Sequence, residues 1–239
     1  MLGPGAEGGA VRRDPLLPRP MAVYRELGDA EADGVVEVLY RVVGRGTALI
    51  ADLREGERVS VVGPLGRGFA EALADAPQPQ SAAGPVYLVG GGSGIASLYA
   101  WARALARAGR TVVVLLGARS RDDLLGWSDF EALGVELVAT TEDGSQGLRG
   151  LVTEPLAARL ETSANATVHA CGPTPMMRAC AALANERGVP CFVSLENPMA
   201  CGFGVCLGCA APLRAGGFAL VCRAGPVFDA GEIDWAGLP

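Results

Sequence analysis

The chain has no lysine, so all 20 of its basic residues are arginine, against 26 aspartates and glutamates. The formal net charge is −6, and the sequence shows no basic face of the kind that nucleic-acid binding requires. Any phosphate group bound by this chain must therefore be held by arginine, by backbone N–H groups or by hydroxyls.

Long hydrophobic runs are also missing. No apolar stretch approaches the roughly 18 residues that span a bilayer, and the longest, around Thr111–Leu116, is typical of a buried strand. The N-terminus has neither the basic head nor the apolar core of a signal peptide. Half of the 239 residues are apolar, which is enough for a sizeable core. We expect a cytoplasmic protein without membrane contact.

Histidine and cysteine are scarce over most of the chain. The single histidine, His169, lies in an apolar stretch, which favours a core residue over a Rieske-type ligand, since that would need a pair. Cysteine is absent before Cys171, and four of the seven cysteines fall between Cys201 and Cys222. In a cytosolic chain, thiols gathered in this way indicate metal or redox chemistry rather than disulfides.

The order of the sequence patterns predicts three parts. Residues 1–76 contain short apolar stretches, Val35–Val43 and Arg58–Val62, with Gly and Pro between them, which is typical of a small antiparallel β-barrel. Residues 84–190 alternate strand and helix patterns, which predicts a doubly wound parallel α/β domain. Residues 191–239 are loop-rich and contain most of the cysteines.

A polar, proline-rich stretch, Asp75–Pro85, resembles a linker between the first two parts. The middle part is expected to contain strands at Val86–Val89, Thr111–Leu116, Val135–Ala139 and Thr167–Ala170, and helices at Ile95–Ala108, Thr153–Leu160 and Pro175–Arg187.

The cysteines near the C-terminus carry the most specific signal. Cys201, Cys206 and Cys209 follow the spacing C-x4-C-x2-C, and Cys222 lies further on, which is the arrangement of the plant-type [2Fe–2S] cluster. The glycines between them allow a short loop to curl until its backbone N–H groups point at the sulfurs. Zinc is the alternative, but zinc sites favour two C-x2-C pairs and only one is present.

A glycine-rich loop, GGGSG at Gly90–Gly94, follows a strand and opens a helix, where phosphate can approach backbone N–H groups. It is not the strict G-x-G-x-x-G motif, and GARS at 117–120 replaces the acidic ribose ligand expected after the second strand. A plain tight turn therefore remains the alternative.

A second candidate for the nucleotide site is Cys171-Gly172-Pro173, which lies at a strand end and before a helix. It places a thiol at the sheet edge where open α/β folds bind ligands. The alternative is an ordinary helix start with proline in its first turn.

Together these motifs resemble the electron-transfer subunits of the FAD- and iron–sulfur-containing, NAD-dependent dihydroorotate dehydrogenases, which belong to the ferredoxin reductase-like superfamily. The resemblance covers nearly the whole chain. It rests on DPLLPRP at 14–20, LYR at 39–41, GRGT at 44–47, GPLGRGF at 63–69, the stretch 171–177 and, most specifically, VCRAGPVFDA at 221–230.

The resemblance implies a FAD-binding barrel, an NAD-binding α/β domain and a C-terminal [2Fe–2S] domain. Its implied FAD contacts are Arg19, Pro20, Met21, Ala22, Leu39, Tyr40, Arg41, Gly46 and Thr47. The expected NAD contacts are Gly90, Gly91, Gly92, Gly94, Cys171, Gly172 and Pro173. Cys171 is the candidate side chain beside the nicotinamide.

The implied function is that of an oxidoreductase component in pyrimidine (UMP) biosynthesis. A partner subunit containing FMN oxidises dihydroorotate, and its electrons pass through the [2Fe–2S] cluster and FAD to NAD⁺. The resemblance also implies a heterotetramer of two plus two chains.

Two departures from the family pattern bear on this expectation. Ala22 stands where the family usually has a serine, which removes a hydroxyl expected to bond the flavin ring. Only 13 residues precede Asp14, where the family has several strands, so we expect either an incomplete barrel or a misplaced start.

Two alternatives remain open. One is a relative with another partner, of the sulfide dehydrogenase or ferredoxin:NADP oxidoreductase type. Such relatives often have Asp in place of Cys201, whereas Arg119 would suit the 2′-phosphate of NADP. The other is a non-catalytic scaffold that keeps the cluster and has lost FAD.

Overall fold

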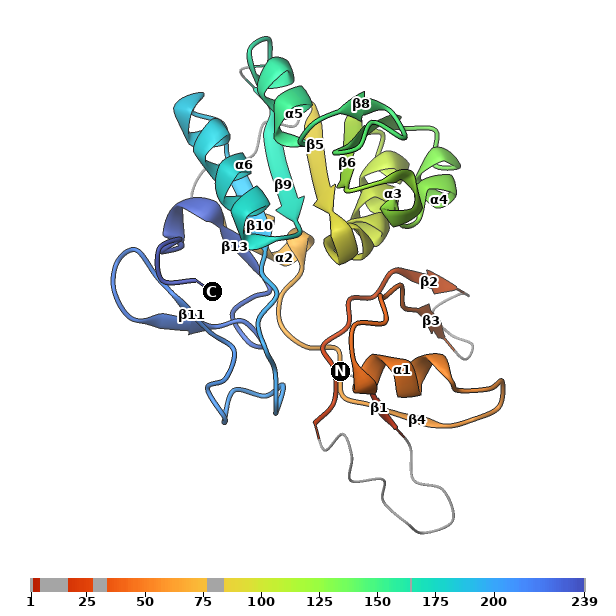
Figure 1. Ribbon diagram of the computed structural model, residues 1–239. Helices are drawn as coiled ribbons and strands as arrows, with labels where there is room; N and C mark the ends of the chain where they lie inside the picture. Colours follow the sequence, from red (N-terminus) through yellow and green to blue (C-terminus); the bar gives the residue numbers. More distant parts are fainter. Residues whose placement is uncertain (1, 5–16, 28–33, 77–83, 164, 239) are drawn as a thin grey trace.

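The computed structural model describes residues 2–4, 17–27, 34–76, 84–163 and 165–238 (Figure 1). Its centre is a seven-stranded sheet in the order β13-β10-β9-β5-β6-β7-β8. The neighbouring strands run parallel, except that β13 pairs antiparallel with β10. The strands are β5 (Val86–Gly91), β6 (Val112–Ala118), β7 (Glu136–Thr141), β8 (Leu148–Arg149), β9 (Thr167–Cys171), β10 (Cys191–Ser194) and β13 (Val227–Asp229).

Helices cover both faces of this sheet, which confirms the doubly wound α/β arrangement (Figure 1). On one face α5 (Thr153–Leu160) and α6 (Thr174–Glu186) bury Leu156 and Met177. On the other, α2 (Phe69–Ala74), α3 (Tyr99–Arg107) and α4 (Trp127–Glu131) pack on the sheet. Every residue of β5 and β9 is buried, because parallel strands between two helix layers face apolar surroundings on both sides.

The strands expected in the middle part are present, and the helices expected at Thr153–Leu160 and Pro175–Arg187 correspond to α5 and α6. The prediction of one helix at Ile95–Ala108 was wrong. A 3₁₀-helix, η1 (Gly92–Ser97), comes first, and α3 begins only at Tyr99. Gly92 to Gly94 contain two poor helix formers, and Gly92 takes a left-handed φ of +55°, so an α-helix cannot begin there.

Before α2, the described N-terminal residues form two antiparallel strand pairs and one helix. β1 (Leu2–Pro4) pairs with β4 (Val59–Val61), β2 (Arg25–Leu27) pairs with β3 (Val35–Glu37), and α1 (Arg45–Ala51) lies beside them (Figure 1). Across the described residues these pairs are separate sheets, so a closed barrel stays a prediction.

The strand expected at Val35–Val43 is shorter in the structure. β3 ends at Glu37, because among the described residues no strand pairs with the following segment, and the side chain of Val43 is 82% exposed. Most of the expected linker Asp75–Pro85 and the first part of the expected flavin motif, residues 14–16, lie outside the described residues.

The C-terminal part adds a small hairpin of β11 (Ala210–Pro212) with β12 (Phe218–Leu220) and the 3₁₀-turn η3 (Ala230–Glu232). A further 3₁₀-turn, η2 (Arg121–Asp123), follows β6 in the middle part. β10 and β13 belong to the central sheet, so the sheet extends across the boundary expected at residue 191. In the part of the chain that is described, no helix is long and apolar enough to cross a membrane.

Candidate functional site

The expected nucleotide residues gather at the carboxyl edge of the parallel sheet. β5 ends at Gly91 and β9 at Cys171, and the two strands are direct neighbours. β6 lies on the other side of β5, so the winding of the chain reverses between β5 and β9. In open α/β sheets, ligands bind outside the carboxyl ends of the strands at such a switch point.

The glycines at this edge have two different uses. A Cβ on Gly94 would lie 2.5 Å from the carbonyl carbon of Cys171, and one on Gly91 would lie 2.5 Å from Met176 Sδ. These glycines let the β5–η1 turn pack directly on the β9–α6 turn. Gly92, in contrast, has open space around it. Its backbone is therefore the part of the expected phosphate loop that has free space beside it.

Cys171 is fully buried at the end of β9. Its Sγ lies 3.4 Å from the carbonyl oxygen of Ser194 and 3.9 Å from Glu196 Oε1. Burial raises the pKa of the thiol to about 12, so it stays protonated at neutral pH. It is therefore a neutral donor rather than a nucleophilic thiolate.

Glu196 is a site residue that the sequence analysis missed. It follows β10, the third neighbouring strand to end at this edge, and its side chain keeps contact with solvent. Partial burial of the carboxylate raises its pKa above the ordinary value, while the contact with Cys171 opposes that shift. The signal in the sequence was an acidic residue two positions beyond a strand end, which only the strand order makes meaningful.

The residues expected to hold FAD come together in part. The Arg19 guanidinium packs so closely on Gly46 that a Cβ there would collide with it. The Thr47 hydroxyl is buried and accepts hydrogen bonds from the N–H groups of Val43 and Gly44, 3.0 and 3.2 Å away, so it fixes the start of α1. Of the other expected contacts, Pro20 is exposed and five are half-buried: Met21, Ala22, Leu39, Tyr40 and Arg41.

Polar and aromatic contacts join these N-terminal segments to the α/β part. Tyr24 donates a 2.8 Å hydrogen bond to Asp129 and stacks on Tyr99, with ring centroids 4.5 Å apart. Burial and the Asp129 carboxylate raise the pKa of Tyr24 well above its ordinary value, so the phenol remains a donor. Arg41 Nη2 donates to Asp123 Oδ1 over 2.6 Å.

The loop at 63–69, which resembled part of the flavin domain, packs on the cysteine-rich segment. A Cβ on Gly66 would collide with the carbonyl oxygen of Gly225, and the N–H of Arg67 donates to that oxygen over 2.5 Å. Arg67 and Pro226 form an isolated parallel bridge. The two sequence signatures, far apart in the chain, therefore form one contact.

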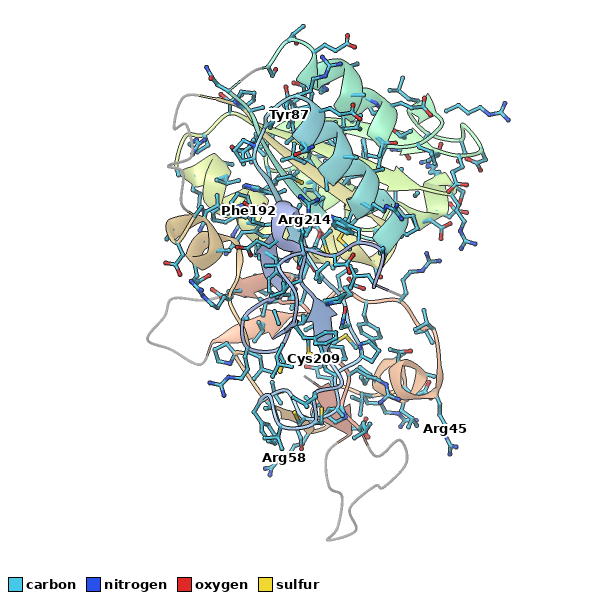
Figure 2. All side chains as sticks on the ribbon, turned by 90° about the vertical axis from the view of Figure 1, so that its left-hand side faces the viewer. Arg45, Arg58, Tyr87, Phe192, Cys209 and Arg214 are labelled. Atoms are coloured by element: carbon cyan, nitrogen blue, oxygen red, sulfur yellow. The ribbon has the colours of Figure 1, made fainter. Side chains whose placement is uncertain are left out.

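The cysteine-rich loop leaves and rejoins the sheet at the same edge. β10 ends at Ser194, which pairs with Val227 at the start of β13, so residues 195–226 form a loop between adjacent strands. Figure 2 shows Cys209 below the sheet that carries Tyr87 and Phe192, toward the level of Arg45 and Arg58.

Backbone N–H groups in this loop point at the sulfurs, as expected. Cys201 Sγ accepts from the N–H groups of Val205 and Cys206 at 3.4 and 3.5 Å, and Cys209 Sγ accepts from that of Cys222 at 3.5 Å. Gly202, Gly204 and Leu207 have φ of +81°, +87° and +60°. Leu207 is the one non-glycine residue with positive φ in the described chain, which marks a tightly constrained loop.

The four thiols form two pairs. Cys201 interacts electrostatically with Cys206, and Cys222 with Cys209. Across the described residues, no three side chains of His, Cys, Asp or Glu gather closely enough to bind a single metal ion. Two pairs of thiolates match a two-iron cluster, which takes four cysteines over two irons.

The pKa shifts of Cys201 and Cys222 bear on how a cluster would be held. The hydrogen bond from the Cys206 N–H leads the effects that lower the pKa of Cys201 to about 6, so its thiolate forms readily. Burial raises the pKa of Cys222 to about 11, and its neighbour Cys209 adds to the shift. A cationic iron centre would offset that cost at the buried pair.

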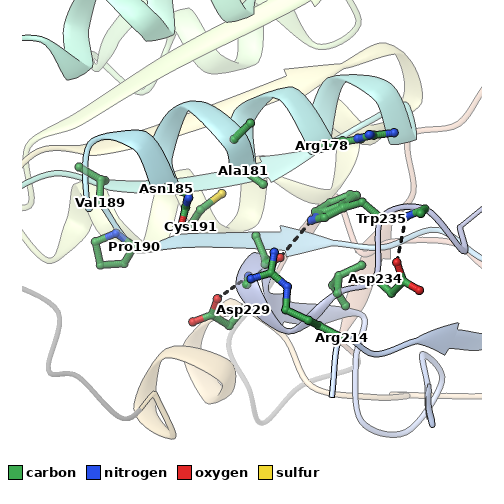
Figure 3. Close-up of a pocket in the computed structure, with 15 residues that line it drawn as sticks. Arg178, Ala181, Asn185, Val189, Pro190, Cys191, Arg214, Asp229, Asp234 and Trp235 are labelled. Carbon is green, nitrogen blue, oxygen red and sulfur yellow. Dashed lines mark hydrogen bonds between the residues drawn. The ribbon is translucent and has the colours of Figure 1, made fainter. Parts of the chain in front are cut away.

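A separate cavity of about 660 Å³ lies between α6 and the C-terminal residues (Figure 3). Arg178 and Arg214 stand at its sides with Asp229 and Asp234, and Trp235 donates to the carbonyl oxygen of Ala230 over 3.1 Å (Figure 3). None of the expected cofactor residues lines it.

Comparison with known proteins identifies the family. Residues 196–234 match the model of the iron–sulfur cluster binding domain of dihydroorotate dehydrogenase B, and residues 88–182 match the oxidoreductase NAD-binding domain. The NAD(+)-dependent dihydroorotate dehydrogenase B electron transfer subunit of Geobacillus kaustophilus is 40% identical over 227 residues, 94% of this chain and 82% of the relative. That of Desulforamulus reducens is 36% identical over 93% of this chain and 82% of the relative. The chain belongs to this family.

Solved structures agree with the family on the fold. A structure of NADH-dependent reduced ferredoxin–NADP oxidoreductase is 34% identical, with a TM-score of 0.77 over 93% of this chain and 76% of that one. The ferredoxin reductase of carbazole 1,9a-dioxygenase, at 23% identity and a TM-score of 0.59, shares the fold over 73% of this chain and 53% of that one. The resemblance expected from the motifs is confirmed, and the fold is ferredoxin reductase-like.

Proposed function

We propose that this chain is the electron-transfer subunit of an NAD-dependent dihydroorotate dehydrogenase in pyrimidine (UMP) biosynthesis, working in the cytoplasm. It takes electrons from the FMN of a catalytic subunit, in a heterotetramer of two plus two chains. Residues 1–76 serve FAD, residues 84–190 serve NAD(H), and residues 191–239 carry the cluster while sharing β10 and β13 with the sheet.

One observation carries the proposal: the three candidate cofactor segments meet at one edge of the sheet. The cysteine-rich loop starts and ends there through the Ser194–Val227 pair. The loop at 63–69 packs on Gly225, and Arg41 reaches Asp123 just beyond β6. Electrons moving from cluster to nicotinamide therefore need not cross the protein.

Each cofactor has residues suited to it. We assign the four thiols Cys201, Cys206, Cys209 and Cys222 to the [2Fe–2S] cluster, with backbone N–H groups oriented toward the sulfurs. We assign Arg19, whose guanidinium lies against Gly46, to binding a pyrophosphate. When bound, FAD exchanges single electrons with the cluster and hydride with the nicotinamide.

At the nicotinamide edge, the protonated Cys171 thiol and the Glu196 carboxylate are held close together. Neither is needed to move a proton in hydride transfer, and we assign them to orienting the nicotinamide ring and excluding water. The Gly92 backbone, with open space beside it, is the expected phosphate contact, together with Gly90, Gly91, Gly94, Gly172 and Pro173 around it.

The partner docks, in this proposal, on the cysteine-rich loop itself. Four large apolar side chains there are solvent-exposed: Phe203 (58%), Val205 (73%), Leu207 (62%) and Phe218 (71%). Cys206 is exposed among them. Exposed apolar patches mark protein interfaces, and a partner covering this one would bring its FMN toward the cluster.

The ferredoxin–NADP oxidoreductase structure at 34% identity supports a second candidate, a subunit serving another electron partner. Against it stand the match of the cluster segment to the dihydroorotate dehydrogenase B domain and the cysteine at position 201.

An anaerobic absorption spectrum with reductant titration tests the proposed function. We expect flavin and cluster bands together, both bleached by NADH, and co-purification with an FMN protein that reduces them with dihydroorotate. Cluster bands without flavin would favour the scaffold alternative. Bleaching of both bands by NADH, with no response to dihydroorotate and the FMN protein, would favour the second candidate.

A further inference from the structure

Asp123 makes the contacts that join the flavin segment to the end of β6. Its Oδ1 accepts a 2.6 Å hydrogen bond from Arg41 Nη2. Its Oδ2 lies 3.4 Å from the Ser120 hydroxyl and 3.6 Å from Arg119 Nε. The side chain is only 18% exposed. One carboxylate therefore holds two groups of residues, with a different oxygen for each.

The two groups belong to different candidate sites. Arg41 lies between β3 and α1, among the residues assigned to FAD. Arg119 and Ser120 follow β6 directly, and the end of the second strand is where a doubly wound domain contacts the ribose of a dinucleotide. Arg119 is 73% exposed, so its guanidinium has room to reach a ligand.

The backbone keeps Asp123 in place between them. Asp123 lies in the tight turn η2, where its N–H donates to the carbonyl oxygen of Ser120 over 3.1 Å, and Leu124 N–H donates to that of Arg121 over 3.1 Å. The buried Leu124 anchors the end of this turn. A shift of Ser120 toward a ligand therefore moves the carboxylate that holds Arg41.

The neighbouring Asp122 offers the contrast. It is exposed in the same turn, and across the described residues no hydrogen bond or ion pair is formed by its carboxylate. The two aspartates share chemistry and position, and differ in whether they bridge the two parts.

We propose that Asp123 is a positioning residue that couples the two nucleotide sites, so that FAD bound at Arg41 strengthens the binding of NAD(H) at Arg119 and Ser120. This inference rests on the proposed function. FAD ordering the Arg41–Asp123 pair leaves Ser120 and Arg119 already placed, so the dinucleotide meets a preorganised strand end. By linkage, NAD(H) strengthens FAD binding by the same factor.

The test is a calorimetric titration of full-length protein with NAD⁺, with the cluster intact, in flavin-free and FAD-loaded forms. NAD⁺ avoids turnover. We expect FAD to tighten NAD⁺ binding about fivefold or more in the wild type and in Asp122→Asn, the matched control. In Asp123→Asn the two affinities should agree within about twofold, because an amide holds Arg41 only weakly.

Ser120→Ala gives a second, milder variant in case Asp123→Asn folds poorly. It leaves the Arg41–Asp123 pair in place and removes one link to the dinucleotide side, so FAD affinity should stay at the wild-type value while the coupling falls. Asp123→Glu keeps the negative charge, so it should retain part of the coupling between FAD and NAD⁺ binding.

The outcomes separate the inference from the function. If wild type and Asp122→Asn bind both nucleotides and Asp123→Asn keeps the full coupling, the inference is overturned and the function stands. Equal NAD⁺ affinity with and without FAD in the wild type also overturns it. A wild type that binds neither nucleotide overturns both.

Discussion

Ala22 stands where the sequence resemblance predicts a serine in the flavin motif. The side chain is half-buried, two residues from the buried Tyr24. Restoring the serine should return one hydrogen bond to the flavin, worth about 1 kcal/mol, or about fivefold in affinity. We predict that Ala22→Ser lowers the Kd for FAD about fivefold, measured by flavin fluorescence quenching.

The control for this change is Ala181→Ser, on α6 and far from the flavin segments in sequence and fold, which should leave the Kd unchanged. An FAD affinity in Ala22→Ser that is unchanged or weaker would show that a hydroxyl at this position makes no hydrogen bond to the flavin.

His169 confirms the expectation of a core histidine, with one difference. It is fully buried, stacks on Phe69 with ring centroids 5.2 Å apart, and its Nδ1 accepts a 2.8 Å hydrogen bond from Trp101 Nε1. Its Nε2 has no partner among the described residues. The sequence predicted burial but could not show that one nitrogen is left unsatisfied.

This burial predicts acid sensitivity. Burial, helped by Arg110, lowers the pKa of His169 to about 3, whereas the unfolded chain titrates near 6.5. Below pH 6.5 the unfolded state binds the proton first, so stability is lost as the pH falls from about 6.5 toward 3. Between pH 7 and pH 5, the titration of His169 should lower the free energy of unfolding by about 2 kcal/mol.

Urea unfolding of wild type and His169→Phe at pH 7 and pH 5 isolates that contribution. Phenylalanine should be less stable at pH 7, since Trp101 loses its acceptor, but should lose about 2 kcal/mol less on acidification. Equal acid losses in both proteins would contradict the assignment.

At the scale of elements, the contact between the β5–η1 turn and the β9–α6 turn is the most constrained. A Cβ on Gly94 would meet the backbone of Cys171 and Gly172 at 2.5 Å, and backbone cannot yield as a flexible side chain does. We predict that Gly94→Ala lowers stability by about 1–3 kcal/mol and weakens NAD(H) binding, because both turns must shift.

Gly44→Ala is the matched control, since Gly44 is extended and nothing lies within 4 Å of its would-be Cβ. Both variants are compared by thermal unfolding and NAD⁺ titration. A Gly94→Ala protein that is as stable as Gly44→Ala would contradict the close packing of the β5–η1 turn on the β9–α6 turn.

The elements of the sheet could be predicted because their physics is local. β5, β6 and β9 are short apolar runs bounded by glycine or proline, and burial on both faces leaves no polar alternation to misread. The segment after β3 could not be predicted. Its valines are typical of a strand, but in the structure Leu39 and Arg41 contact the α/β part. These contacts are tertiary, and no local sequence pattern encodes them.

The residues of the candidate site also fall into those that the sequence could predict and those that it could not. The cysteines were found from spacing, because a cluster demands fixed ligand separations. Glu196 and Asp123 were not, since their roles depend on which strands end side by side.

For the whole molecule, the exposed apolar side chains of the cysteine-rich loop predict where the catalytic subunit binds. Phe218 is 71% exposed on β12 and is not a cluster ligand. We predict that Phe218→Asp weakens the complex tenfold or more, as loss of an interface anchor does, while the cluster spectrum stays unchanged.

Leu151→Asp, at a comparably exposed leucine (58%) before α5, is the control and should leave complex formation unchanged. Binding is measured by titrating the FMN subunit and following flavin fluorescence. Equal weakening in both variants would point to a general loss of solubility rather than to a docking surface.

The most direct measurement is the iron and acid-labile sulfide content of the anaerobically purified chain. The account predicts about two irons and two sulfides per chain. Both should be lost in Cys209→Ser and kept in Cys180→Ser, a buried thiol in α6 outside the loop. Zinc in place of iron, or iron without sulfide, would contradict it.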